Sequence, residues 1–460
     1  MLFSSITFLF YYLPIFLLSY YIVPWKYKNA ILFIFSLFFY AWGEPKNVFL
    51  MLISIFICYI LGILIEHNQN QPQKKLTCLI GVLISLSFLF YFKYINFFIQ
   101  NINAVTNLNL SKINIVLPIG ISFYTFQIIS YLVDVYRGAE AQHNFISLGT
   151  YIAMFPQLIA GPIIRYSDVN KQLEKRNITI DSIGYGIERF VIGLAKKVLL
   201  ANQFGEIITI YKTSNNLSIA FTILYIISLA FQIYFDFSGY SDMAIGLGKM
   251  LGFSFNENFN YPYMATSISD FWRRWHISLG NWFKDYVYIP LGGNKCKKTR
   301  WIFNLFAVWF LTGFWHGATW NFIIWGLYFC VLLIIEKQWL QSFLCKHVGI
   351  SHIYVLILVL FSFVIFDNES FSMIGKTLQN LYSLNFINIE SIYYYKKYFI
   401  LLIIGVICST PCIKLLYEKQ SLKMKILLDY FEIIGLIVLF IIVISYLANG
   451  SYNPFLYFRF

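Results

Sequence analysis

Two of the six histidines lie where an ionisable side chain is costly to place. His316 lies within FLTGFWHGATWNF, among mostly apolar residues, and His276 lies within FWRRWHISL. An ionisable residue inside a membrane segment is by default a candidate for function, and a neutral imidazole can accept a proton near neutral pH. The two histidines are 40 residues apart, which allows one loop and one membrane helix between them, so both could face one cavity. The structural alternatives are a hydrogen bond between helices for His316 and an interfacial hydrogen bond for His276.

Basic residues gather on both sides of His276 in the sequence. They either attract a phosphorylated cytosolic donor or set the orientation of a membrane protein, whose cytoplasmic loops are rich in lysine and arginine. The cluster consists of Arg273, Arg274, Lys284, Lys295, Lys297, Lys298 and Arg300.

Other charged residues interrupt apolar sequence further upstream. Asp236 and Asp242 flank FSGYS and are candidates for a site, a helix cap or an ion pair. Arg165 follows AGPII and is either a site residue or an interfacial anchor. The sequence has no GxxxxGKS/T phosphate loop, no HExxH and no GxSxG, so nucleotide hydrolase and serine hydrolase chemistry are not expected. The seven cysteines form no paired CxxC, so neither a disulfide framework nor a metal site is expected.

The composition is that of a polytopic membrane protein. Of 460 residues, 59% are hydrophobic and 12% charged, and the mean hydropathy is +0.67. A soluble protein of this length needs far more charge on its surface. About eleven apolar runs approach the ~20 residues that a spanning helix needs. They are residues 4–23, 29–42, 48–65, 77–95, 115–135, 218–235, 301–314, 321–335, 353–366, 398–408 and 433–447.

The placement of lysines predicts the orientation. Lys26 and Lys28 follow the first run and Lys74 and Lys75 follow the third, whereas Lys46 lies beside Glu44 after the second. This alternation favours an extracytoplasmic N-terminus. The first run has no basic segment before it and no small-residue cleavage site, so it is expected to be a retained helix.

The middle of the chain differs from its two ends. Between residues 118 and 320, proline, glycine and charged residues repeatedly break the apolar runs, as at 155–168 and 235–246. Broken helices at membrane depth are tolerated where protein or a water-filled cavity satisfies the backbone. Residues 260–300 are amphipathic and predict short interfacial helices and a cytoplasmic loop. We therefore expect one membrane domain, residues 1–460, with its catalytic part at about 118–336.

Four segments together resemble the membrane-bound O-acyltransferase superfamily, in particular its bacterial branch of alginate and peptidoglycan O-acetylation proteins. The resemblance runs along the whole chain, and the ordered motifs WRRWHISL, YIPLGG and FWHGATWN are its most specific part. YIPLGG points to acetyl transfer over D-alanyl transfer to teichoic acid. The segments are FPQLIAGPIIRYSD, FDFSGYSDMAIGLGKMLGFSFNENFNYPY, SISDFWRRWHISLGNWFKDYVYIPLGGNK and LTGFWHGATWNFIIWG.

The resemblance implies an all-α fold, a ring of membrane helices with short re-entrant or interfacial helices around a central tunnel. It implies that His316 is the catalytic residue and His276 its partner. The donor would be a cytosolic thioester such as acetyl-CoA or an acyl carrier, with no bound cofactor and no metal, and the acceptor would lie across the membrane. One departure is Asp367, which stands where related proteins usually carry arginine, so that role is not transferred. Further motif residues expected to line or support the tunnel are Asp236, Tyr240, Asp242, Trp315, Asn321 and Arg165.

Acetyl transfer requires a hydroxyl to lose its proton as it attacks the thioester, and a histidine base contributes typically about 10²–10⁴-fold. Gly313 and Gly317 would leave room beside His316 for the reactants. Related systems place a Phe-Leu-Tyr-x-x-Phe segment at the reaction centre, which Phe455–Phe460 match here. Because a phenol has a pKa of ~10, an acetyl-tyrosine is a good acetyl donor. Tyr457 is therefore a candidate acetyl relay, and the alternative for this tail is an aromatic segment lying in the interface.

These expectations describe an O-acetyltransferase of the bacterial cytoplasmic (inner) membrane that serves an extracytoplasmic glycan. Peptidoglycan is favoured because the chain carries no extra extracytoplasmic domain. Alginate, another exopolysaccharide and teichoic acid are the alternatives. The expected partners are a separate extracytoplasmic O-acetyltransferase of the SGNH type and the lipid bilayer, and no nucleic acid is expected. A transporter of acetyl donor or glycan, and a scaffold for a periplasmic transferase, are alternatives of other classes.

Overall fold

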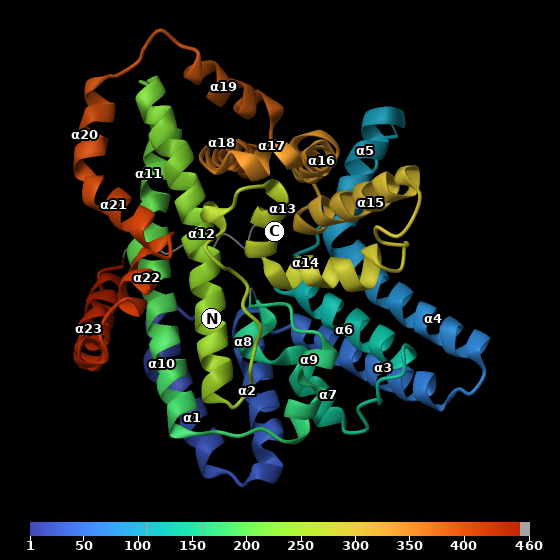
Figure 1. Ribbon diagram of the computed structural model, residues 1–460. Coiled ribbons are helices and arrows are strands. Elements are labelled where there is room, and N and C mark those ends of the chain that lie inside the picture. Colours follow the sequence, from blue (N-terminus) through green and yellow to red (C-terminus); the bar gives the residue numbers. More distant parts are fainter. Residues whose placement is uncertain (107, 160, 451–460) are drawn as a thin grey trace. The chain divides into compact units, whose positions relative to one another are not determined.

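The computed structural model describes residues 1–106, 108–159 and 161–450, and the described residues are helical wherever they form regular structure (Figure 1). Contacts between residues divide the chain into two compact units. The described residues of the first are 1–106, 108–159, 161–190 and 243–256, and those of the second are 191–242 and 257–450. The all-α fold class expected from the sequence is confirmed, whereas the single domain remains a prediction.

The first unit contains the N-terminal helices. Its core surrounds Phe155, whose ring centroid lies within 6.2 Å of the centroids of five other aromatic rings, those of Phe3, Phe8, Tyr12, Phe16 and Phe39. The helices are α1 (Leu13–Ile22), α2 (Lys28–Gly43), α3 (Asn47–His67), α4 (Gln71–Leu89), α5 (Ile95–Thr106), α6 (Ile121–Tyr136), α7 (Phe145–Ala153), α8 (Phe155–Leu158), α9 (Tyr166–Glu174) and the start of α10 (Ile180–Ala195).

The second unit holds both candidate histidines. Its helices are α11 (Asn202–Thr213), α12 (Ile219–Met250, up to Asp242), α13 (Ile268–Arg274), α14 (Ile277–Phe283), α15 (Lys298–His316), α16 (Trp320–Ile335), α17 (Gln341–Lys346), α18 (Val348–Asp367), α19 (Phe371–Leu381), α20 (Ile389–Lys397), α21 (Phe399–Cys408), α22 (Cys412–Glu418) and α23 (Leu422–Ala448). Short π-helical turns join several of them, among them η4 (Lys196–Ala201) and η7 (Glu336–Leu340).

Within the described residues, six helices are long and apolar enough to cross a membrane, and a seventh span results if α20 and α21, bent by 55°, count as one. The protein is therefore a multi-pass membrane protein, and the count of about eleven spans is not confirmed. Several expected runs form helices shorter than a full span, such as α1 and α2. The short helices expected within residues 260–300 are present as α13 and α14.

The expected break at residues 235–246 is wrong, because α12 continues through it as one helix of 32 residues. The two glycines of this stretch serve packing. A Cβ atom on Gly239 would lie 2.7 Å from the carbonyl oxygen of Gly193, and one on Gly246 would lie 2.5 Å from that of Gly186. Small residues that let helix backbones approach closely are common where membrane helices cross.

Candidate active site

His276 lies in the turn between α13 and α14 and is buried, with 1% of its surface exposed. Its backbone is in the left-handed region, at φ 45° and ψ 50°, which non-glycine residues adopt only where surrounding structure holds them. Helix α13, which precedes this turn, is anchored at its start. The backbone N–H groups of Ile268 and Ser269 donate hydrogen bonds to the Glu336 carboxylate at 2.6 and 3.1 Å. Ser267 caps the same helix by accepting from the N–H of Asp270.

The His276 ring is fixed by one hydrogen bond and by aromatic packing. Its Nδ1 lies 3.2 Å from Oδ1 of Asn258. The ring packs edge-on against Phe237 of α12, with centroids 4.6 Å apart. Neither Asn258 nor Phe237 was singled out in the sequence, because nothing in their own surroundings signals a contact with a turn many residues away.

His316 is the last residue of α15 and is 5% exposed. Three aromatic rings surround its imidazole, with centroids 5.0 Å away for Trp315 and Trp325 and 5.4 Å away for Phe366. The expectation that Gly313 and Gly317 leave room for reactants is wrong. A Cβ atom on Gly313 would lie 2.3 Å from the carbonyl oxygen of Phe322, and one on Gly317 would lie 2.3 Å from the Phe322 ring. The space beside these glycines therefore belongs to α16, which lies alongside α15 (Figure 1).

The structure places both histidines next to the same indole ring, that of Trp315, and the cavity that they are expected to share stays a prediction. The ring centroid of Trp315 lies 5.0 Å from the ring centroid of His316 and 6.1 Å from that of His276. Burial, and then the charge of His316, lower the pKa of His276 well below its usual value. A lowered pKa keeps His276 neutral at physiological pH, and a neutral imidazole can accept a hydrogen bond or a proton.

The two aspartates of α12 form ion pairs with neighbouring lysines of η4. Asp236 pairs with Lys197 at 2.5 Å, with both side chains nearly fully buried. Asp242 pairs with Lys196 at 2.6 Å. Of the alternatives left open by the sequence, the structure therefore contains the ion pairs. Tyr240 lies between them on the same helix and is 2% exposed.

Asn321 supports the site from the start of α16. Its Nδ2 donates to the backbone oxygens of Ile365 and Phe366 at 3.4 and 3.3 Å. Phe366 is the residue whose ring contacts His316. The next residue, Asp367, accepts a hydrogen bond from Tyr225 at 2.8 Å and pairs with Lys212 at 2.5 Å.

Most of the basic cluster is exposed to solvent. Arg274 is the partly buried member and pairs with Asp270 at 3.0 Å. Arg300 also donates to the backbone oxygen of Leu291 at 3.2 Å. The start of a helix already carries partial positive charge. Lysines and an arginine at the start of α15 therefore add to a positive potential; they are Lys297, Lys298 and Arg300.

The sequence also predicts Arg165 and Tyr457 as site residues. Arg165 belongs to the first unit and binds Asp168 through Nε at 3.0 Å and a terminal nitrogen at 2.9 Å, at the start of α9. Tyr457 lies outside the described residues, as do Phe455, Leu456 and Phe460.

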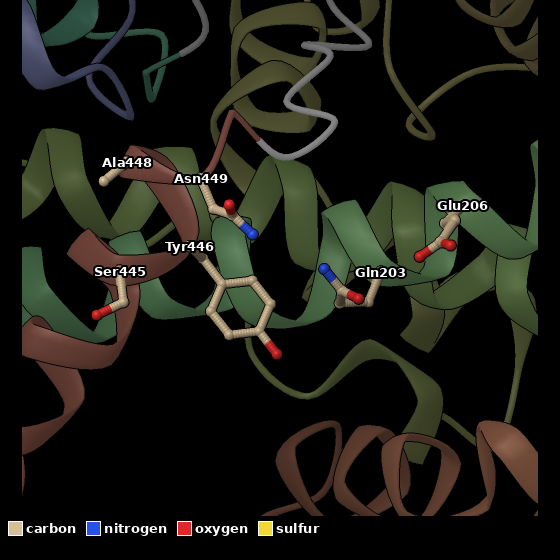
Figure 2. Close-up of a pocket in the computed structure, with 6 residues that line it drawn as sticks. All are labelled: Gln203, Glu206, Ser445, Tyr446, Ala448 and Asn449. Carbon is tan, nitrogen blue, oxygen red and sulfur yellow. The ribbon is translucent and has the colours of Figure 1, made fainter.

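A cavity of about 680 Å³ opens between α11 and α23 (Figure 2). No residue singled out in the sequence lines it. Its lining residues are Gln203, Glu206, Ser445, Tyr446, Ala448 and Asn449. It is therefore separate from the site that contains the two histidines.

Comparison with known proteins identifies the family. The model of the membrane-bound O-acyltransferase family matches residues 37–375. The chain belongs to this family. It is an acyltransferase, and its resemblance to the bacterial branch is confirmed by its relatives.

Three relatives illustrate the range of bacterial proteins that are similar to this chain. The probable alginate O-acetylase AlgI of Azotobacter vinelandii is 40% identical over 392 residues, which cover 83% of this chain and 78% of the relative. The peptidoglycan O-acetyltransferase of Helicobacter pylori is 36% identical over 373 residues, covering 74% and 71%. The teichoic acid D-alanyltransferase of Bacillus subtilis is 32% identical over 252 residues, covering 50% and 63%.

Proposed function

We propose that this acyltransferase takes acetyl from a cytosolic thioester, acetyl-CoA, and passes it across the membrane for O-acetylation of an extracytoplasmic glycan. The observation that carries the proposal is the buried pair of His276 and His316 around Trp315. O-acetyl transfer is favoured over D-alanyl transfer because the O-acetylating relatives match far more of the chain. Peptidoglycan and an alginate-like exopolysaccharide are the candidate acceptors, since relatives named for both are similar.

In this mechanism His316 is the general base. It accepts the proton of a hydroxyl whose oxygen attacks the thioester carbonyl carbon. The carbon–sulfur bond then breaks, and the thiolate leaves and takes the proton back from the imidazolium. His276, neutral because its pKa is lowered, supplies a second acceptor beside the reacting hydroxyl. Tyr457 is the proposed first hydroxyl, whose acetyl ester would pass to a serine of a separate extracytoplasmic O-acetyltransferase.

The distribution of charge in the first unit supports an extracytoplasmic N-terminus. The Tyr21 hydroxyl donates to the Met250 oxygen at 2.7 Å, and Trp25 Nε1 to that of Glu174 at 3.3 Å, so the ends of α1, α9 and α12 meet. Cytoplasmic ends of membrane proteins are enriched in lysine and arginine. The residues at this end include Lys26, Lys28, Lys171, Lys175, Arg176 and Lys249, against the acidic Glu174 and Asp181. The start of α1, at the opposite end, would then face outward, and we propose the bacterial cytoplasmic membrane as the location.

The donor site is proposed at the exposed basic cluster near the start of α15. The phosphates of CoA are anions, and a concentration of fixed positive charge raises their local concentration and rate of binding. Replacing Lys295, Lys297 and Lys298 together by glutamine would raise KM for acetyl-CoA and reduce its salt dependence. The exposed Lys376, exchanged for glutamine, is the matched control for loss of a surface charge.

The proposal is tested with the purified chain and radiolabelled acetyl-CoA in lipid nanodiscs. An acyltransferase releases CoA and acquires or passes on the label, whereas a transporter does neither. His316→Ala should abolish CoA release, and retained release would refute the assignment of the base. Tyr457→Phe should block transfer to the acceptor, and full transfer would refute the relay. In a deletion strain, the glycan that loses its acetyl ester identifies the acceptor.

A further inference from the structure

The segment that follows α12 holds the turn that carries His276. Asn258 in this segment is 1% exposed. Its backbone oxygen accepts from the N–H of Ile277 at 3.0 Å, and the N–H of Asn260 donates to the Arg274 oxygen at 2.9 Å. Two backbone hydrogen bonds therefore clamp the segment against the turn on both sides of His276.

The side chain of Asn258 adds three contacts at one atom. Its Oδ1 lies 3.2 Å from the backbone nitrogen of Ser278, 2.9 Å from the Ser278 hydroxyl and 3.2 Å from Nδ1 of His276. Its Nδ2 donates to the hydroxyl of Ser241 on α12 at 3.0 Å. A single asparagine thus ties the turn to a long membrane helix.

These contacts determine which ring nitrogen of His276 carries hydrogen. A backbone N–H can only donate, so the amide atom that faces the N–H of Ser278 is the carbonyl oxygen. A carbonyl oxygen can only accept, so Nδ1 of His276 must be the donor in their hydrogen bond. A neutral imidazole has hydrogen on one nitrogen, and the lone pair therefore lies on Nε2.

The Nε2 atom is buried, and no protein atom of the described residues forms a hydrogen bond with it. The neighbours of the ring are Phe237 and Trp315, which are uncharged, and the titratable group that acts on it is His316. A buried acceptor without a protein donor costs free energy in a membrane protein. Such a lone pair is suited to a proton supplied by a reactant.

We propose that Asn258 is a positioning residue that holds His276 in the Nδ1–H tautomer and presents its Nε2 lone pair to the reacting hydroxyl. The tautomer follows from the contacts of Asn258, whereas the identity of the group at Nε2 rests on the proposed function. The left-handed backbone of His276 fits this role, because the clamp holds the ring in one orientation.

The tautomer is measured directly by solid-state NMR of the full chain, labelled with ¹⁵N-histidine, in lipid bilayers. The His276 resonances are assigned from the signals that His276→Gln removes. At neutral pH we expect a protonated Nδ1 and an unprotonated Nε2. Asn258→Leu, which removes the acceptor at similar size, should shift His276 towards the Nε2–H tautomer. The matched control is Asn304→Leu, which removes another fully buried asparagine of the second unit and should leave the tautomer unchanged.

The rate of CoA release from acetyl-CoA provides the second measurement. Because His316 is the base and His276 contributes a hydrogen bond beside it, Asn258→Leu should lower kcat by about 10-fold, with little change in KM. Asn258→Asp retains an acceptor and should restore most of kcat. Its carboxylate stabilises the imidazolium and therefore raises the pKa of His276. As the pH is lowered, His276 should become protonated, and activity should be lost, at a higher pH than in the unaltered chain.

The outcomes separate this inference from the proposed function. An unaltered chain with hydrogen on Nε2 of His276 would overturn the inference whatever the activity. An unchanged tautomer in Asn258→Leu would overturn it as well. If the tautomer shifts as expected while kcat stays at the level of the unaltered chain, the positioning role of Asn258 stands and the catalytic role of His276 is refuted. Should Asn258→Leu fail to fold, the tautomer of the unaltered chain and the pH shift of Asn258→Asp still decide.

Discussion

The ring of Phe366 lies edge-on against that of His316, with centroids 5.4 Å apart and an interplanar angle of 80°. Phe366 is the penultimate residue of α18. The last carbonyl groups of a helix have no partner within it. Asn321 of α16 supplies donors to two of them, those of Ile365 and Phe366. One wall of the histidine site thus depends on a side chain that caps a neighbouring helix.

Replacing Asn321 by leucine should therefore loosen this wall. Two carbonyl groups lose their donor, and we expect the free energy of unfolding to fall by about 1–3 kcal/mol. CoA release should fall as well, because Phe366 no longer orients His316. Thermal unfolding in nanodiscs and the rate of CoA release measure the two effects. Thr319→Val is the control: it removes the hydrogen bond to Asn321 Oδ1 and keeps both donors. An equal loss in both variants would contradict the capping role.

The Asp367 carboxylate has two partners that can be separated. Asp367→Asn loses the ion pair with Lys212, whose side chain is 40% exposed, and keeps an acceptor for Tyr225. Because half-exposed ion pairs contribute only about 0–1 kcal/mol, this variant should remain close to the unaltered chain in its unfolding midpoint. Asp367→Ala leaves the buried Tyr225 hydroxyl without its acceptor and should cost about 1–3 kcal/mol. The same midpoint for both variants would refute this division.

The ion pair of Lys197 and Asp236 is deeply buried, with 3% and 2% of the two side chains exposed. Removing one partner leaves a deeply buried charge without this counter-ion, so Lys197→Met should cost about 3–5 kcal/mol. The double variant Lys197→Met, Asp236→Leu removes both charges and should recover most of this loss. Thermal unfolding of the two single variants and the double variant measures the coupling. A double variant less stable than either single variant would show that the pair is required as charges.

Gly313→Ala tests the packing of α15 on α16. The added Cβ atom would lie 2.3 Å from a backbone oxygen of Phe322 and 3.3 Å from Gly326 Cα, so one helix must move. We expect loss of CoA release and a strongly lowered unfolding midpoint. Gly435→Ala is the matched control on α23, where no described atom beyond the adjoining turns of the helix itself lies within 4 Å of the added carbon. Since alanine favours helix over glycine by about 1 kcal/mol, this control should be neutral or stabilising.

The sequence predicts the helical class, the membrane setting and the histidine pair because each depends on residues that can be recognised singly. It does not predict the contacts that position the pair. Asp242 was expected within a broken helix, because its partner Lys196 lies 46 residues earlier in the chain and no local pattern connects them. Lysines form ion pairs with both aspartates, and the glycines of this stretch pack against the backbone of α10. A continuous helix is therefore the favourable conformation.

The same limitation applies to Gly313 and to Asn258. A glycine beside a functional histidine is compatible with space for a reactant or for a neighbouring helix, and only the position of Phe322 distinguishes them. Asn258 lies in a polar stretch, NENFNYPY, where an asparagine gives no signal of a special role. Its role follows from the direction of an N–H group, which depends on the folded backbone.

The left-handed backbone of His276 limits which residues the position tolerates. Asparagine, aspartate and glycine adopt this conformation most readily, whereas β-branched residues are strongly disfavoured. In a saturation library, asparagine and glycine at position 276 should therefore yield folded protein without activity, and valine or isoleucine should reduce the yield itself. The requirement for an imidazole and the requirement for a particular backbone would thus appear as two different sets of permitted amino acids at one position.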